Sequence, residues 1–120
     1  MCVTPIHPTM FRAGKIELDA IPQKDLQNYT SLETLAKKNF CDLLIEKSQN
    51  EKIPKDYNVF RILARRKGLD QKYVFGDDTV TVRKNTPIED VAQKIYDASA
   101  RAIKITKTKA MQIAKTYIKI

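Results

Sequence analysis

Apolar and polar residues alternate with a period of two near the start of the chain. Ile16, Leu18 and Ala20 alternate with charged residues within the segment 15–21, a spacing that is typical of a half-buried strand. Pro22 follows directly, and proline lacks the amide that a sheet ladder needs. We therefore predict a short strand at the edge of a sheet.

A helical period begins at Thr30, which stands three residues before Glu33. This reciprocal capping pattern satisfies the free backbone amides at the start of a helix. Apolar residues then recur at steps of three and four, which predicts a helix over about 31–48 with one face packed on a sheet. These apolar positions are Leu32, Leu35, Ala36, Phe40, Leu43 and Leu44.

The segment 57–66 is rich in β-branched and aromatic residues, which predicts a strand. Within it, Phe60, Ile62 and Ala64 share one face, and the other face holds Tyr57, Val59, Arg61, Leu63 and Arg65. The turn residues Arg66-Lys67-Gly68 follow, so a hairpin connection is expected here.

Two further strands are predicted at 72–75 and 79–83, joined by a tight turn at Gly76-Asp77-Asp78. Tyr73 and Phe75 lie two residues apart on one face, a pair that we expect in the core. Consecutive strands with such short connections form an antiparallel meander.

Thr86-Pro87-Ile88-Glu89 repeats the capping pattern, with proline at the first helical position. The helix that it begins carries one stripe of apolar and small residues, which are Ile88, Val91, Ala92, Ile95, Ala98, Ser99 and Ala102. Beyond Ala102 several β-branched residues blur the stripe. Two alternatives remain open: the helix continues toward Tyr117, or it breaks near Ile105 and a separate helix begins near Lys107.

These elements predict one α+β domain, since 120 residues is an ordinary size for a single domain. We expect an antiparallel sheet of three to four strands in the order β-α-β-β-β-α, two main helices on one face, and a long or broken C-terminal helix. The chain is divided into a flexible N-terminal segment at 1–14, the α+β domain at 15–103 and a basic amphipathic C-terminal helix at 104–120.

The net charge of +8 is concentrated near the C-terminus, because the last 22 residues hold six basic residues and no acidic one. Apolar residues in the same segment would need a partner to cover them. We therefore expect a binding surface here, made of Arg101, Lys104, Ile105, Lys107, Lys109, Ile113, Lys115, Tyr117 and Lys119. A secondary basic patch is expected at Arg61, Arg65, Arg66 and Lys67.

The residues that common catalytic mechanisms require are missing. The single histidine, His7, lies between Pro5 and Pro8 in the expected flexible segment. This position disfavours a histidine-based triad. Gly14, Gly68 and Gly76 are the only glycines, so neither a dinucleotide fingerprint nor a P-loop is present. Two cysteines and one histidine are too few for a structural zinc site. We predict a non-enzymatic protein without cofactor or metal.

The order helix, three strands, helix over about 31–103 resembles that of the double-stranded RNA-binding domain. That family contacts RNA with a lysine-rich start of its second helix, whereas the matching residues here include Glu89 and Asp90, which repel phosphate. We therefore do not carry RNA binding over from this resemblance.

Two functional hypotheses remain. The first is a protein-protein interaction module, an adaptor, inhibitor or accessory protein of the kind found in phage or bacterial effector systems, which uses its basic C-terminal helix to form a homodimer or to bind an acidic protein. The second is nucleic-acid binding through the same segment. Without an apolar stretch of about 20 residues or a signal peptide, we expect no transmembrane segment and a cytoplasmic protein, or export by a signal-independent route. Contact of the helix with a membrane surface is the weaker interpretation.

Overall fold

The computed structural model describes residues 16–18, 29–48 and 50–117. The predicted flexible segment at 1–14 lies outside the described residues. The elements, in chain order, are β1 (Ile16–Leu18), α1 (Thr30–Lys38), β2 (Asp42–Lys47), β3 (Tyr57–Lys67), β4 (Tyr73–Arg83) and α2 (Ile88–Tyr117). The predicted α+β class and the number of strands are confirmed, but β2 lies where a helix was predicted and β4 replaces two predicted strands.

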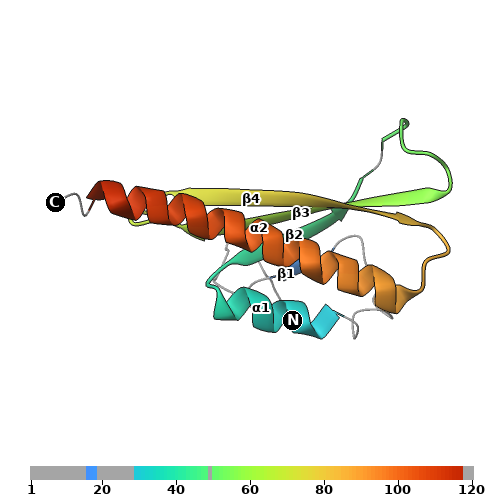
Figure 1. Cartoon of the computed structure of the whole chain (residues 1–120), viewed down its shortest axis with the longest axis horizontal. Helices are drawn as coiled ribbons and strands as arrows, with labels where there is room; N and C mark the ends of the chain where they lie inside the picture. The colour runs from blue at the N-terminus through green and yellow to red at the C-terminus, as the bar shows by residue number, and fades with distance from the viewer. Residues whose placement is uncertain (1–15, 19–28, 49, 118–120) are drawn as a thin grey trace, which may run out of the picture.

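The four strands form one sheet in the order β1-β2-β3-β4. β1 therefore lies at an edge of the sheet, as predicted. β2, β3 and β4 pair antiparallel, as expected. β1 instead pairs parallel with β2, because α1 lies between them in the chain and supplies the crossover that parallel neighbours require. Figure 1 shows both helices on the same side of the sheet, with α2 running obliquely along β3 and β4.

The core lies between the helices and one face of the sheet. Alternate residues of the central strands point into it, so Ile45 and Ile62 are fully buried while Arg61 is exposed. Leu32 and Ile95 cover them from α1 and α2. Phe60, Ile62 and Ala64, which share one face of β3, are all buried in this core. We call the face of the sheet opposite the helices the outer face.

The predicted helix at 31–48 is wrong in its second half. α1 ends at Lys38, and Phe40 then adopts a φ of 55°, a left-handed conformation that ends a helix. Beyond it the chain forms β2, in which Leu43 and Ile45 are buried. Steps of two and of three to four overlap in so short a stretch, so the apolar spacing alone did not separate the two structures. Phe40, expected in the core, is 71% exposed.

The predicted turn at Gly76-Asp77-Asp78 is also wrong, since β4 runs through it without interruption. Gly76 stands there because α2 crosses β4 at this point, and a side chain would collide with the backbone of the helix. The two aspartates alternate between the faces of the strand: Asp77 lies 3.9 Å from Arg61, and Asp78 lies 2.5 Å from Arg101.

α2 is a single helix from Ile88 to Tyr117, which decides between the two alternatives for the C-terminal segment. Two of the β-branched residues that blur the sequence pattern belong to the core: Ile103 is 2% exposed and Thr106 is fully buried. The Thr106 hydroxyl donates a hydrogen bond of 2.6 Å to the Ile103 carbonyl oxygen. Packing on the sheet therefore outweighs the lower helix propensity of these residues.

Candidate interaction sites

The C-terminal half of α2 lies beside the hairpin that joins β3 and β4. A methyl group on Gly68, in the hairpin, would lie 3.2 Å from Ile113 Cδ1. The Lys109 ammonium group donates a hydrogen bond of 2.7 Å to the Phe75 carbonyl oxygen of β4. We call this part of the molecule, residues 67–75 and 104–117, the basic end.

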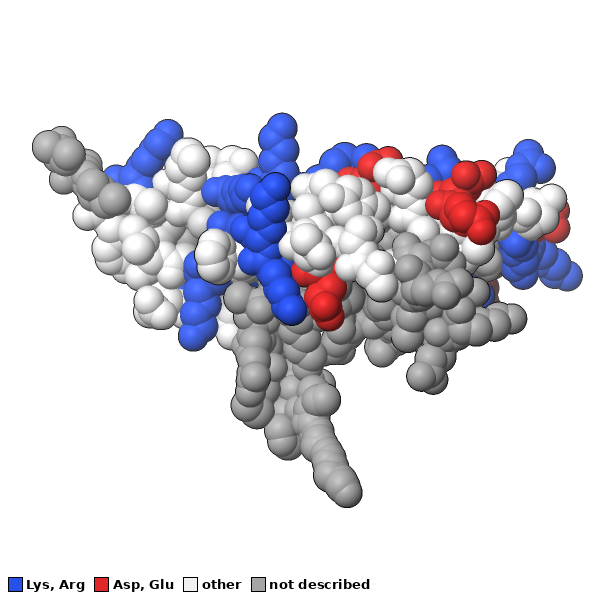
Figure 2. Space-filling view, turned by 90° about the horizontal axis from the view of Figure 1, so that it is seen from below, with Lys and Arg blue, Asp and Glu red and all other residues white. Residues whose placement is uncertain are grey.

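Most of the predicted binding residues on α2 are exposed at the basic end. Lys104, Lys107, Lys109 and Lys115 are exposed. Ile105 is 38% exposed and Tyr117 is 64% exposed, whereas Ile113 is half-buried against the hairpin. In Figure 2 this end lies at the left, where the visible described surface is basic or uncharged and acidic side chains appear only farther along. Lys119 lies outside the described residues.

Arg101 lies apart from the basic end and is neutralised within the fold. Its Nε lies 2.5 Å from the Asp78 carboxylate, and the Thr79 amide donates to the same carboxylate at 2.8 Å. Burial raises the pKa of Asp78, but the hydrogen bonds from Arg101 and Thr79 and the charge of Arg101 outweigh burial and lower the pKa. Arg101 therefore has less charge to offer a partner than the lysines beyond it.

The predicted secondary basic patch is divided between the two faces of the sheet. Arg61 and Lys67 are exposed on the outer face. Arg65 lies on that face too, 3.5 Å from the Asp42 carboxylate and 4.0 Å from the centre of the Tyr73 ring.

Arg66 belongs to the opposite face and has a structural role. Its guanidinium donates a hydrogen bond to the Asn39 carbonyl oxygen and approaches Cys41 Sγ at 3.5 Å. These contacts tie β3 to the turn between α1 and β2. A run of basic residues within a strand alternates between faces, so the patch could not be continuous.

The sequence interpretation missed several exposed apolar side chains at the basic end. Tyr73 and Phe75, expected in the core, are 38% and 42% exposed on the outer face, with ring centres 6.5 Å apart. Leu69 in the hairpin is 54% exposed and Met111 on α2 is 59% exposed. The alternation of residues along β4 could have revealed this exposure. Val74 and Gly76 are buried, so Tyr73 and Phe75 point to the opposite face.

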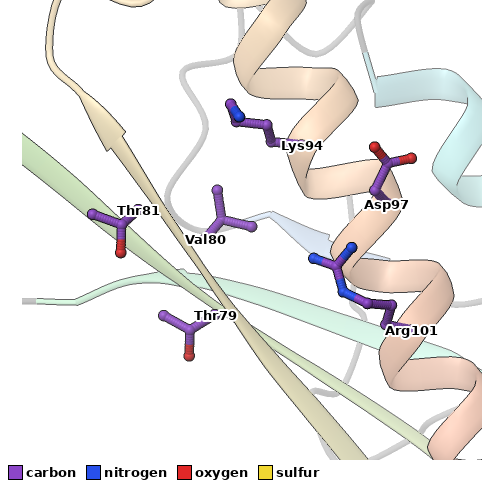
Figure 3. Close-up of a pocket in the computed structure, with 6 residues that line it drawn as sticks. All are labelled: Thr79, Val80, Thr81, Lys94, Asp97 and Arg101. Atoms are coloured by element: carbon purple, nitrogen blue, oxygen red, sulfur yellow. The ribbon is translucent and has the colours of Figure 1, made fainter.

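A groove of about 270 Å³ runs between β4 and α2, away from the basic end. Its strand side is made by Thr79, Val80 and Thr81, and its helix side by Lys94, Asp97 and Arg101. Figure 3 shows the Lys94 side chain extending from α2 toward β4. Among the described residues Lys94 has no hydrogen bond or ion pair, whereas Asp97 accepts a hydrogen bond of 3.0 Å from Gln93.

The described residues hold no cluster of three or more His, Cys, Asp or Glu side chains that could bind a metal ion. None of the described helices has the length and apolar character needed to cross a membrane.

No protein-family model, curated protein or solved structure matches this chain.

Proposed function

We propose that this protein is a non-enzymatic interaction module that binds an acidic partner protein through its basic end. The observation that carries the proposal is the meeting of lysines and exposed apolar side chains on one continuous part of α2. Lys104, Lys107 and Lys115 are exposed there together with Met111 and Tyr117. Lysine side chains at the rim of an apolar patch attract acidic partners, and the apolar centre supplies the surface to bury.

The hairpin adds to this surface and holds it rigid. Leu69 is exposed in the hairpin, and the bond from Lys109 to the Phe75 carbonyl oxygen links the helix to β4. A surface that is ordered before binding loses less conformational entropy when a partner docks. The basic end therefore has the charge, apolar area and rigidity of a docking site.

A homodimer through this same surface is less favourable than binding an acidic protein. Residues 104–117 contain Lys104, Lys107, Lys109 and Lys115 and no acidic residue. Two copies meeting at their basic ends would bring these charges together. Like charges that face each other across an interface typically cost several kcal/mol of binding free energy.

Nucleic-acid binding is the second candidate, and one observation favours it. Tyr73 and Phe75 are both exposed on the outer face next to the basic residues Arg65 and Lys67. Exposed aromatic rings on a sheet can stack on unpaired bases. However, the Arg65 guanidinium lies over the Tyr73 ring at 4.0 Å, so it occupies one of the faces on which a base would stack.

Site-specific photo-crosslinking in the cells that produce the protein tests the proposal. A photoreactive residue in place of Met111 should crosslink an acidic protein. The same residue in place of Glu51, which is exposed in the loop between β2 and β3, is the control and should not crosslink it. The product should disappear in a Lys107→Glu, Lys115→Glu variant, because two attractive charges become repulsive.

The salt dependence of binding, measured in solution with the purified protein and the partner that the crosslink identifies, separates the two candidate functions. A protein complex with an apolar centre should persist when salt rises from about 50 to 200 mM, whereas a complex held by phosphates loses roughly 10³-fold or more of its affinity. A nuclease-sensitive product would support nucleic-acid binding. Equal crosslinking from positions 111 and 51, or no effect of the charge reversal, would refute a function of the basic end.

A further inference from the structure

The outer edge of β4 has no strand partner among the described elements. β4 is the last strand of the sheet and pairs with β3 along its whole length, from Tyr73 to Arg83. The register is regular from end to end, without a bulge. An edge strand of this length presents a row of backbone groups that a further strand can pair with.

Hydrogen bonds show which residues direct their backbone groups away from β3. The Phe75 carbonyl oxygen accepts a bond from Lys109, and the Thr79 amide donates to the side chain of Asp78. In an antiparallel pair, alternate residues bond to the neighbouring strand and the residues between them point outward. Since positions 75 and 79 point outward, Asp77, Thr81 and Arg83 do so as well.

The two ends of this edge differ in how they are protected. Lys109 covers the edge at Phe75, and Asp78 occupies the Thr79 amide. Beyond them the sequence 79–82 is Thr-Val-Thr-Val, all β-branched, with no lysine or proline. Lysine, proline and bulges are the usual devices that keep an edge strand from pairing, so their absence leaves this half of β4 ready to pair.

The groove beside this half of the edge favours a particular side chain in the added strand. A strand laid along β4 would direct alternate side chains to the helix side of the sheet, beside Val80 and into the groove. Arg101 and Asp97 already have partners there, Asp78 and Gln93. Gln93 is uncharged, so Asp97 keeps its negative charge, but Lys94 has no partner among the described residues and is the cation in the groove that can pair with an acidic side chain.

We propose that the edge of β4 at residues 77–83 binds an extended segment of a partner protein as an added strand, through the outward backbone groups that Asp78 and Lys109 do not occupy, with an acidic side chain of that segment paired to Lys94. A second copy of β4 fits less well, because its only acidic side chain on the helix side, Asp78, already pairs with Arg101. This site is separate from the basic end, so either can fail without the other.

Fluorescence anisotropy with a labelled peptide tests this site. The probe is a peptide of about seven residues, a common strand length, that alternates threonine with valine and has glutamate in place of the central valine. It should bind the full chain. A peptide with lysine at the central position should bind at least about tenfold more weakly, since it meets Lys94 with a like charge.

Variants of the protein test whether the probe binds as an added strand and whether it pairs with Lys94. Thr81→Pro removes an outward amide and leaves the bonds between β4 and β3 in place, so the probe should bind at least about tenfold more weakly. Thr81→Ala, the control, keeps the amide and should weaken binding far less than Thr81→Pro does. Lys94→Glu should reverse the preference, favouring the lysine peptide over the glutamate peptide.

The Lys107→Glu, Lys115→Glu variant should bind the probe as the parent protein does, because its changes lie at the basic end. Loss of probe binding in that variant would place the peptide at the wrong site and overturn the proposal. Absence of binding by the parent, or an unchanged preference in Lys94→Glu, would overturn it too. A dimer in light scattering that Thr81→Pro converts to a monomer would show that a second copy occupies the edge instead.

Discussion

Gly76 of β4 lies directly against Ala102 of α2, so close that a β-carbon at Gly76 would overlap the Ala102 carbonyl oxygen. The same β-carbon would lie 2.8 Å from Cβ of Ile105. Backbone therefore meets backbone where the helix crosses the strand. This contact sets the height of α2 above the sheet and with it the position of every lysine beyond the crossing.

Replacing Gly76 with alanine should destabilise the protein. The helix has to move away from β4 to admit a methyl group, and overpacking of this kind costs about 1–3 kcal/mol. The free energy of unfolding, measured in urea, should fall by that amount. Gly68→Ala is the matched control: its nearest neighbours, Asp70 Oδ1 at 3.1 Å and Ile113 Cδ1 at 3.2 Å, are ends of side chains that can rotate away. An equal loss in both variants would contradict the proposed crossing.

The same glycine explains why part of the fold could not be predicted from the sequence. Gly76-Asp77-Asp78 has the composition of a turn, and only the contact with α2 shows why glycine stands within a strand. Local patterns did predict α2, from its capping residues and its apolar stripe, and the grouping of Phe60, Ile62 and Ala64 on one face of β3. They failed where a distant element determined the conformation or where a short segment fitted both periods, as at Leu43.

The candidate site was predictable to a similar degree. The spacing of lysines along a helix shows which of them share a surface. The sequence could therefore place Lys104, Lys107 and Lys115 together, and all three are exposed. Tyr73 and Phe75 were assigned to the core because aromatic residues usually lie there, and their exposure depends on which face the helices cover. The edge of β4 has no sequence signature, because an edge exists only once the strand order is known.

Arg66 and Arg61 should differ in their effect on stability, although the sequence places them in one basic patch. Arg66→Met leaves the partly buried Asn39 carbonyl oxygen without its guanidinium partner, and such a loss costs about 1–3 kcal/mol. Arg61→Met removes an exposed ion pair with Asp77, which is worth at most about 1 kcal/mol. Urea unfolding of the two variants measures the difference, and similar values would show that Arg66 does not secure the turn.

The contribution of Asp78 to stability should be lost in acid, because it depends on the charged carboxylate that pairs with Arg101. Its pKa in the folded protein lies below the ordinary value of 3.8, because the hydrogen bonds from Arg101 and Thr79 and the charge of Arg101 outweigh burial. The charged carboxylate therefore stabilises the fold above about pH 3.8, and this contribution is lost as the pH falls through the lower pKa of the folded state.

Arg101→Gln should raise the pKa of Asp78, measured by the chemical shift of its carboxyl carbon during an NMR titration. Lys104→Gln removes the same charge one turn farther along α2 and is the control, with no comparable effect. Stability at neutral pH should change little, since Arg101 is largely exposed and such pairs contribute at most about 1 kcal/mol. An unchanged Asp78 titration in Arg101→Gln would show that the pair does not form in solution.

Shortening α2 at two positions should separate folding from binding. A chain that ends at Ala102 loses Ile103 and Thr106, both of which are buried, and with them the hydrogen-bonding contact of 3.4 Å between Thr106 and Cys41. Deleting one large buried aliphatic side chain costs about 2–5 kcal/mol, so this chain should be largely unfolded by circular dichroism.

A chain that ends at Ala110 keeps those core residues and should fold, with a lower melting temperature because the half-buried Ile113 is lost. It lacks Met111, Lys115 and Tyr117, which are exposed at the basic end. Recovery of the acidic partner through a crosslinker at Lys107 should therefore fall by at least about tenfold relative to the full chain, since both charge and apolar area are missing. Unchanged recovery from the folded, shortened protein would show that the binding surface does not lie at the end of α2, because the two chains differ only in that segment.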